Sequence, residues 1–262
     1  MKPVNPNIKT YFRKDNAAAV WWNVDNLPRY HGQTTWLGEH FPFHNHRVLD
    51  LACGKDRFSI LAAQKGAIEV IAVDISKKML EEARQKAEET DAPAVIRFIE
   101  SDLETFNPDG LFDCILLMEV LVHLPDPGAA IQRAFDLGTS SGWFATNIDF
   151  PYTESRIFQG FQSQLNTLYN FLPSFVRRSL ANRLGWPYRV TRKLRLNTVE
   201  ATLEKLEEDP TLQLSRPDDA YSSIAPKEVY FWLEEAGFKI ERKKLEWFFG
   251  LPVGMTVVAR KP

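Results

Sequence analysis

The chain has 262 residues, of which 44% are hydrophobic, and a formal net charge of −2 at pH 7. These values indicate one ordinary soluble domain with an insertion, and no stretch is long and uncharged enough to span a membrane. The polar first ten residues do not have the pattern of a signal peptide. Two cysteines, Cys53 and Cys114, lack metal-ligand spacing. We therefore expect reduced thiols and a cytoplasmic location.

Residues 1–46 are rich in aromatic side chains interrupted by proline and histidine. We expect two short helices here, at about 10–22 and 32–39, packed across the open end of a sheet. His40, His44 and His46 form a cluster, but no acid or cysteine accompanies them in a metal-ligand spacing. We expect no metal site.

Residues 47–59 predict a short buried strand, a turn of small residues and a helix that begins near Asp56. A second apolar strand, 70–73, follows and ends in Asp74. A unit of this length predicts a parallel crossover whose loops collect at the carboxyl ends of the strands. Amide groups at such a turn suit a carboxylate or phosphate, and an acid ending the next strand suits ribose hydroxyls. The unit therefore predicts a nucleoside-cofactor site.

The glycines of the turn indicate which cofactor it takes. A dinucleotide fold expects G-x-G-x-x-G, and the corresponding residues here are Ala52, Gly54 and Arg57, which disfavours a nicotinamide-dependent oxidoreductase. The stretch Asp50-Leu-Ala52-Cys-Gly54-Lys-Asp56 instead resembles the first motif of class I S-adenosylmethionine (SAM)-dependent methyltransferases, D-x-G-x-G-x-G. The acid and the central glycine match, and the outer glycines are Ala52 and Asp56. Aspartate tolerates left-handed backbone and caps helices well, so we expect the turn to survive.

This resemblance implies that SAM is the cofactor and suggests which residues contact it. Asp74 would hold the ribose, and Met79, one turn later on a helix over 76–89, would pack on the adenine. After a strand at 95–99, Asp102 would accept from the adenine amine. An N-terminal helical lid covers the cofactor in the family, which would bring Tyr11 and Trp36 near it, although simple core packing is an alternative for each. The full set of expected cofactor contacts is Asp50, Ala52, Gly54, Asp74, Ile75, Met79, Asp102, Leu103, Met118 and Tyr11.

Residues 112–120 form the most continuously apolar run and predict a central strand. The following Glu119 to His123 stretch resembles the fourth motif of small-molecule methyltransferases, which makes His123 the candidate catalytic base, with a structural role as the alternative. A helix over 127–137 and a strand over 142–148 follow. Asn147 and Asp149 end that strand and are candidate substrate contacts or turn caps.

Residues 155–199 contain no acidic residue and eight basic ones. Because the whole chain sums to −2 and this span to +8, the rest sums to −10. An amphipathic helix is expected from residue 157 to residue 172. The span could be a substrate lid for an anionic or aromatic molecule, a membrane-surface contact through 157–184, an RNA-binding surface, or a solvated face. On the lid hypothesis, Arg177 and Tyr221 join Trp36 as candidate substrate contacts.

The C-terminal part predicts a helix over 226–236, closed by Gly237, and two strands at 238–249 and 254–260 that pair as an antiparallel hairpin. This region resembles the close of many small-molecule methyltransferases, including those of quinone biosynthesis. The expected fold is α/β, a doubly wound, mostly parallel, Rossmann-like sheet of seven strands with this hairpin and a helical insertion. The domains are predicted as a lid (1–46), a core (47–152 with 221–262) and the insertion (153–220).

The sequence thus predicts an enzyme that moves the SAM methyl group to an oxygen, nitrogen or carbon nucleophile of a small, anionic or aromatic molecule. We expect a monomer or homodimer that does not insert into membranes and does not bind nucleic acid. Two alternatives stay open. One is a non-catalytic SAM-fold binding module, which Asp56 in the cofactor loop favours. The other is an RNA methyltransferase that uses the basic insertion.

Overall fold

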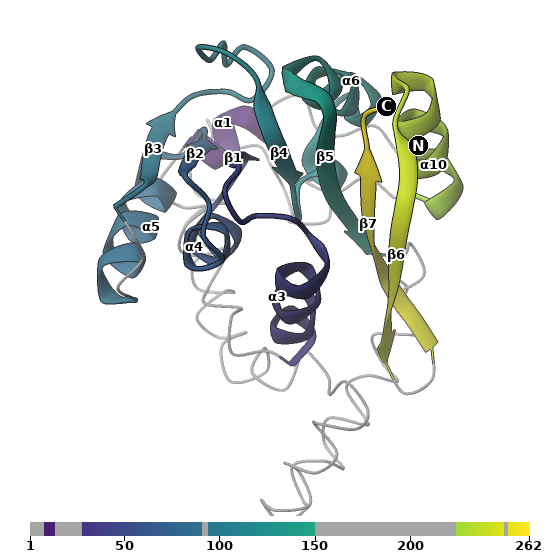
Figure 1. Ribbon diagram of the computed structural model, residues 1–262, viewed down its shortest axis with the longest axis horizontal. Coiled ribbons are helices and arrows are strands. Elements are labelled where there is room, and N and C mark those ends of the chain that lie inside the picture. The colour runs from purple at the N-terminus through teal and green to yellow at the C-terminus, as the bar shows by residue number, and fades with distance from the viewer. Residues whose placement is uncertain (1–7, 14–27, 91–93, 150–223, 249–250) are drawn as a thin grey trace, which may run out of the picture.

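The structure is a computed structural model (Figure 1), and it describes residues 8–13, 28–90, 94–149, 224–248 and 251–262. A seven-stranded sheet with the order β3-β2-β1-β4-β5-β7-β6 forms its centre. The strands are β1 (Arg47–Leu51), β2 (Glu69–Asp74), β3 (Ile96–Glu100), β4 (Phe112–Leu117), β5 (Gly138–Asp149), β6 (Lys239–Phe248) and β7 (Leu251–Arg260). The predicted seven-stranded sheet is therefore confirmed.

The directions and the order of the strands determine where a ligand can bind to the sheet. Strands β3, β2, β1, β4 and β5 pair in parallel, whereas β7 runs antiparallel to both β5 and β6. The chain moves outward from β1 through β2 to β3 and then returns to the other side of β1 with β4. Ligands of open α/β sheets bind at such a switch point, beyond the carboxyl ends of the strands.

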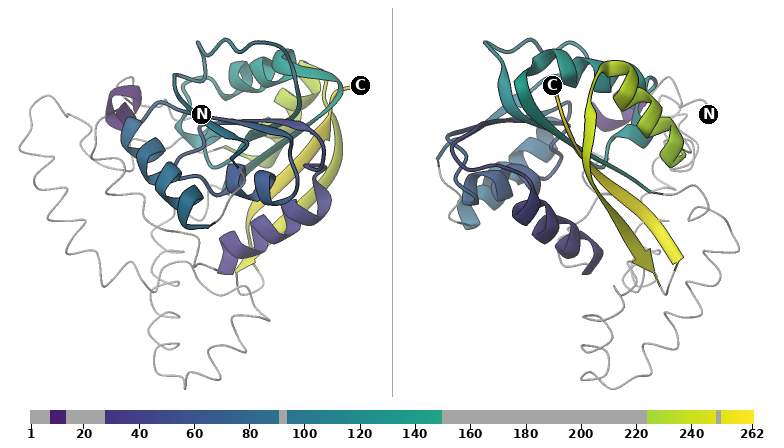
Figure 2. Two further views of the ribbon diagram at one scale, coloured as in Figure 1. Left: turned by 60° about the vertical axis from the view of Figure 1, so that its left-hand side comes forward. Right: turned by 45° about the vertical axis from the view of Figure 1, so that its right-hand side comes forward.

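Helices cover the sheet, as Figures 1 and 2 show. They are α1 (Ile8–Arg13), α3 (Pro28–His40), α4 (Phe58–Gln64), α5 (Lys77–Glu89), the 3-10 helix η1 (Leu121–His123), α6 (Pro127–Leu137) and α10 (Pro226–Ala236). Helices α6 and α10 pack against each other, and α3 packs on α4. Among the residues described, no helix is long and apolar enough to cross a membrane.

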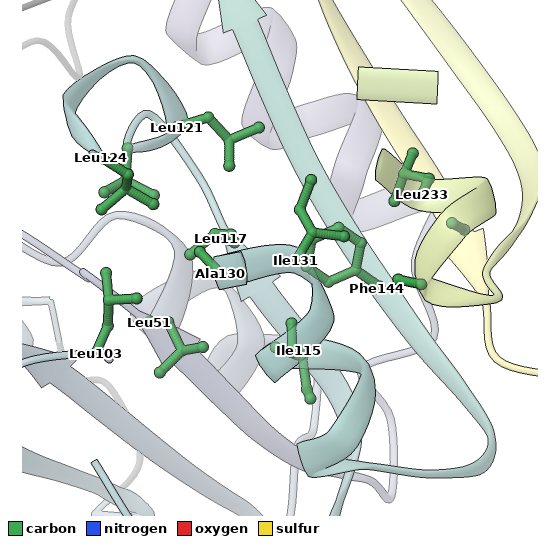
Figure 3. Close-up of a cluster of buried hydrophobic side chains, with 14 of the residues drawn as sticks. Leu51, Leu103, Ile115, Leu117, Leu121, Leu124, Ala130, Ile131, Phe144 and Leu233 are labelled. Carbon is green, nitrogen blue, oxygen red and sulfur yellow. The ribbon is translucent and has the colours of Figure 1, made fainter. Parts of the chain in front are cut away.

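Two hydrophobic clusters fill the two sides of the sheet, because successive side chains of a strand point to opposite faces. Leu49 and Leu51 of β1 belong to the cluster that contains Ile131 of α6 and Leu233 of α10 (Figure 3). Val48, which directly precedes Leu49, belongs to the other cluster, with residues of α3 and α4. The continuously apolar strands follow from this burial on both faces.

Most predicted element bounds agree with the structure, and the differences have local causes. Strand β4 ends at Leu117 rather than near residue 120, because Glu119 adopts a left-handed backbone with a φ of 58° and the chain turns into η1. Helix α3 begins at Pro28, before the predicted start, since proline is favoured in the first turn of a helix. The first predicted helix is described only as α1, and its remainder lies outside the described residues. The basic insertion and its amphipathic helix also lie outside them.

Candidate functional site

The turn between β1 and α4 is built on three left-handed residues at alternate positions. Ala52, Gly54 and Asp56 have φ values of 61°, 59° and 58°. These are the three positions at which the methyltransferase motif commonly has glycine. A left-handed backbone costs a residue with a side chain about 1–2 kcal/mol. The turn thus keeps its shape with only one glycine, as the sequence predicted.

Asp74 joins the end of β2 to this turn. Its Oδ2 accepts a hydrogen bond from the Gly54 amide at 2.8 Å, and its Oδ1 accepts one from the Ser76 amide at 2.8 Å. Burial raises the pKa of Asp74, while the amide donors of Ser76, Gly54 and Ile75 oppose that rise. Asp74, which the sequence predicts to bind the ribose, therefore contacts the turn that is predicted to bind the cofactor. A carboxylate with amide donors on both oxygens has a fixed orientation.

Asp50 supports the turn from the interior. The Ser59 hydroxyl of α4 donates to Asp50 Oδ2 at 2.7 Å, and the aspartate is almost completely buried. Burial and the neighbouring Asp56 raise the pKa of Asp50 to about 7. Asp50 therefore holds β1 and α4 together behind the loop.

Asp56 supplies a buried carboxylate at the third glycine position. Its Oδ1 accepts from the Ile60 amide at 3.3 Å, which caps the first turn of α4. Its side chain is 1% exposed, and within the described part of the chain its Oδ2 has no hydrogen-bond partner. Burial raises the pKa of Asp56 to about 6, against the effect of donors from Ser59 and Ile60. An unpaired, buried carboxylate oxygen in this loop fits a cationic group of a ligand.

Most of the apolar cofactor candidates belong to the core, and one of them packs beside the loop. A methyl group built on Gly54 would lie 3.8 Å from Met79 Sδ, so Met79 packs beside the turn. Leu103 and Met118 are buried members of the two hydrophobic clusters, and Ile75 is half-buried. Core packing accounts for these contacts in the structure, and their contact with a cofactor stays a prediction.

Helix α1 lies against the candidate residues at the ends of β3 and β4. Lys9 Nζ lies 2.8 Å from Asp102 Oδ2 and 2.5 Å from Glu104 Oε2, and Arg13 lies 3.9 Å from Asp102. Burial alone would raise the pKa of Asp102, but the hydrogen bond and charge of Lys9 hold it below its usual value. The N-terminal segment thus reaches the residue predicted to bind the adenine. The side chain of Tyr11 lies outside the described residues.

The candidate base, His123, sits in η1 with 8% of its surface exposed. The Phe12 ring of α1 meets its imidazole edge-on, with 5.2 Å between ring centroids. His123 is therefore at the expected edge of the sheet, beneath α1.

A polar network that the sequence did not predict lies at the same edge. Asn147, a predicted substrate contact, hydrogen-bonds Glu119, which follows β4. The network continues through Gln33 of α3 to Arg57 and to Glu246 of β6. Glu119 carried a usable signal in the sequence, because it is the first charged residue after an apolar strand. Gln33 and Glu246 carried no signal in the sequence, because the contacts that define them span up to 223 positions.

Of the remaining substrate candidates, the structure describes the side chain of Trp36, which packs elsewhere. Trp36 packs against the cluster of α3 and α4 and stacks on His40, with ring centroids 4.9 Å apart. The side chain of Asp149 and all of Arg177 and Tyr221 lie outside the described residues. No group of three or more potential metal ligands occurs in the ranges that the structure describes.

Comparison with known proteins gives consistent matches. Residues 48–142 match a family model described as a methyltransferase domain. The ubiquinone biosynthesis O-methyltransferase of Paracidovorax citrulli is 30% identical over 130 residues, which cover 47% of this chain and 54% of that protein. The protein of the same name from Chromobacterium violaceum is 28% identical over 131 residues, covering 48% and 56%. The chain spans about half the length of these curated relatives.

Solved structures with the same fold align with this chain. Magnesium protoporphyrin IX methyltransferase from Synechocystis, with S-adenosylhomocysteine (SAH) bound, has a TM-score of 0.60 at 19% identity and covers 97% of this chain and 98% of that one. The [4+2]-cyclase SpnF has a TM-score of 0.61 at 14% identity, with coverage of 100% and 99%. At these identities the likeness concerns the fold, which serves more than one chemistry.

Proposed function

We propose that this chain, which carries a class I SAM-dependent methyltransferase domain, moves the methyl group of SAM to a nucleophile of a small molecule. The observation that supports this most directly is the hydrogen bond between Asp74 and Gly54 at the switch point of the sheet. It joins the predicted ribose ligand to a turn with the left-handed pattern of the methyltransferase motif.

The residues present fit SAM part by part. The unpaired oxygen of Asp56 would take its ammonium group. Asp74 would accept from the ribose hydroxyls. Asp102 would accept from the adenine amine, beside Met79.

When bound, SAM supplies a methyl group on a sulfonium that is already a strong leaving group. The protein is left with alignment of the acceptor and exclusion of water. Helix α1, held to the ends of β3 and β4 by Lys9 and Phe12, supports the exclusion of water. His123 remains our sequence-derived candidate for a general base, which is needed only if the acceptor must lose a proton.

A hydroxyl oxygen is the acceptor atom that we favour over nitrogen and carbon. Both curated relatives reported above are named as O-methyltransferases, and the region that matches the family model contains Asp74, Glu119 and His123. The choice of substrate depends on the basic insertion as well, whose roles as a lid, a membrane-surface contact or an RNA-binding surface stay predictions.

A non-catalytic SAM-binding protein is the second candidate function. Asp56 supports it, because a side chain at the third glycine position could place the methionine end of SAM away from an acceptor. Such a protein would bind SAM and SAH and transfer no methyl group.

Calorimetry of the full chain with SAM, SAH and NAD tests both candidates. We expect SAM and SAH to bind and NAD to give no signal, and a screen with methyl-labelled SAM then separates an enzyme from a binding protein. Failure of both SAM and SAH to bind would refute the proposed function.

A further inference from the structure

We propose that Glu119 is the carboxylate that contacts the methyl acceptor and takes its proton, so that the acceptors are compounds with an O–H or N–H donor. This inference rests on the proposed function and adds a residue and a substrate class to it. The acceptor oxygen or nitrogen forms a bond to the methyl carbon as the S–C bond breaks, and the electron pair of that bond stays on sulfur. The acceptor proton passes to a carboxylate oxygen of Glu119.

The backbone and side chain of Glu119 are both held by Asn147. The Glu119 amide donates to Asn147 Oδ1 at 2.7 Å, and Asn147 Nδ2 donates back to Glu119 Oε1 at 2.6 Å. The glutamate has a left-handed backbone, with a φ of 58°. Such a conformation is strained in a residue with a side chain and persists where the surroundings fix it. The reciprocal pair therefore sets where the Glu119 carboxylate lies.

Gln33 of α3 adds a second fixed contact. Its Nε2 lies 3.2 Å from Glu119 Oε1 and 3.2 Å from Glu246 Oε1. Its Oε1 accepts from Arg57 at 3.0 Å, which assigns the two ends of the amide. Thr256 of β7 donates to Glu246 at 3.1 Å and closes the network. Glu119 is thus supported from α3, β5 and the C-terminal hairpin.

Exposure separates Glu119 from the residues that support it. Gln33 is 0% exposed, Asn147 3% and Glu246 5%. The Glu119 side chain is 31% exposed. Buried polar groups that hold one partly exposed carboxylate in a fixed place are the arrangement of a prepared catalytic or binding group. His123, at 8% exposed and covered by the Phe12 ring, is the less accessible proton acceptor.

The position and charge of the network indicate what it can bind. Glu119 follows β4, and Arg57 follows the cofactor turn, so the carboxylate lies at the switch-point edge where the sulfonium is expected. Arg57 lies 3.7 Å from Glu119, and the charge of Lys244 acts on Glu246, so both carboxylates have a cation near them. A carboxylate accepts hydrogen bonds only, so it favours acceptors that carry a donor and disfavours anions.

Four benzene derivatives serve as probes of this preference for donor-bearing acceptors, with the full chain saturated with SAH. Catechol carries O–H donors and o-phenylenediamine carries N–H donors, whereas 1,2-dimethoxybenzene lacks donors and benzoate is an anion. Ligand-observed NMR measures their binding, and labelled SAM measures transfer to them. We expect catechol or the diamine to bind at least about tenfold tighter than the other two, because a site built for a donor rejects the analogue without it.

Glu119→Gln should remove that preference and lower kcat/KM by roughly 100-fold or more, while the Kd for SAH stays within about twofold. Glu119→Asp retains the charge and should keep part of the rate. Asn147→Ala, at a positioning residue, should lower kcat and leave KM for SAM unchanged. Glu88→Gln, an exposed glutamate of α5, is the matched control. His123→Ala, measured beside them, should cost less than Glu119→Gln.

Three outcomes would overturn the inference. They are a wild-type rate in a folded Glu119→Gln variant, tighter binding of benzoate than of the donor-bearing probes, and no binding of any donor-bearing probe to the SAH-loaded wild type. A wild type that does not bind SAH would refute the proposed function itself, and this inference with it.

Discussion

At the scale of single residues, Asp74 has the best-supported role. Its two oxygens accept hydrogen bonds from the amides of Gly54 and Ser76, so it orients the turn and keeps lone pairs for the proposed ribose contact. Its position at the end of β2 and its contact with the turn both follow from the crossover between β1 and β2.

Asp74→Ala is expected to weaken SAM binding at least about tenfold, or 1.4 kcal/mol, since it removes a charge-assisted acceptor and the anchor of Gly54. Calorimetry with SAM measures this. Asp109→Ala, at an exposed aspartate far from the turn in sequence, should leave the affinity unchanged. An unaltered affinity in Asp74→Ala would remove the ribose assignment.

Asp56 and Asp50 link stability to pH. Their folded-state pKa values of about 6 and about 7 lie above the ordinary value of 3.8, because burial disfavours the charged forms. The folded state therefore binds more protons than the unfolded state between about pH 4 and pH 7, and the free energy of unfolding falls as pH rises through that window.

Asp56→Asn should make this fall in the free energy of unfolding about 2–3 kcal/mol smaller. The reason is that burial raises the pKa of Asp56 to about 6, and asparagine does not titrate. Urea unfolding at pH 4 and pH 7.5, without SAM, measures the difference. The same variant should bind SAM more weakly at pH 7.5, because it cannot offer a charge to the ammonium group. Equal pH dependence in wild type and variant would contradict the burial of an ionisable Asp56.

At the scale of elements, helices α1 and α10 have different structural roles. Helix α1 is short and contacts the sheet through Lys9, Arg13 and Phe12, whereas α10 packs on α6 and buries apolar side chains. We therefore expect α1 to affect access to the site and α10 to affect the stability of the whole domain.

Lys9→Ala should release α1 with little effect on global stability, because partly exposed ion pairs contribute about 0–1 kcal/mol. Hydrogen exchange of the amides in Ile8–Arg13 should become faster, and SAH should dissociate faster, while Tm changes by less than about 4 °C. Lys77→Ala, on the exposed start of α5, is the control. Unchanged exchange in α1 would show that Lys9 does not hold the helix.

Leu233→Ala should destabilise the domain by about 2–5 kcal/mol, since the leucine is fully buried against the sheet and α6 (Figure 3). Phe231→Ala provides a control on the same helix, because that side chain is 58% exposed and should change stability by less than about 0.5 kcal/mol. Chemical unfolding of both variants gives the comparison. Equal losses would mean that the assigned inner face of α10 is wrong.

At the scale of the whole molecule, the site combines segments from almost the full length of the described chain. Gln33, Arg57, Glu119, Asn147 and Glu246 come from five different elements or loops and meet at one edge of the sheet. The cofactor turn, in contrast, is formed by residues less than 30 positions apart. The proposed cofactor site and the proposed acceptor site thus depend on the fold to different degrees.

The sequence by itself determined the sheet, its C-terminal hairpin, and the pairing of the small-residue turn with Asp74. Those features depend on local signals: apolar runs, the spacing of turn residues, and the crossover rule that joins neighbouring parallel strands. It did not reveal the polar network. No local periodicity relates Gln33 to Glu246, and only the packing of α3 against the ends of the strands brings them to Glu119.

The tertiary structure also decided the state of residues that the sequence had named. Asp102 is paired with Lys9, and Asp56 has a buried oxygen with no partner among the described residues. These states depend on burial and on groups brought near from other segments, because the same carboxylate ionises, pairs or stays unpaired according to what surrounds it.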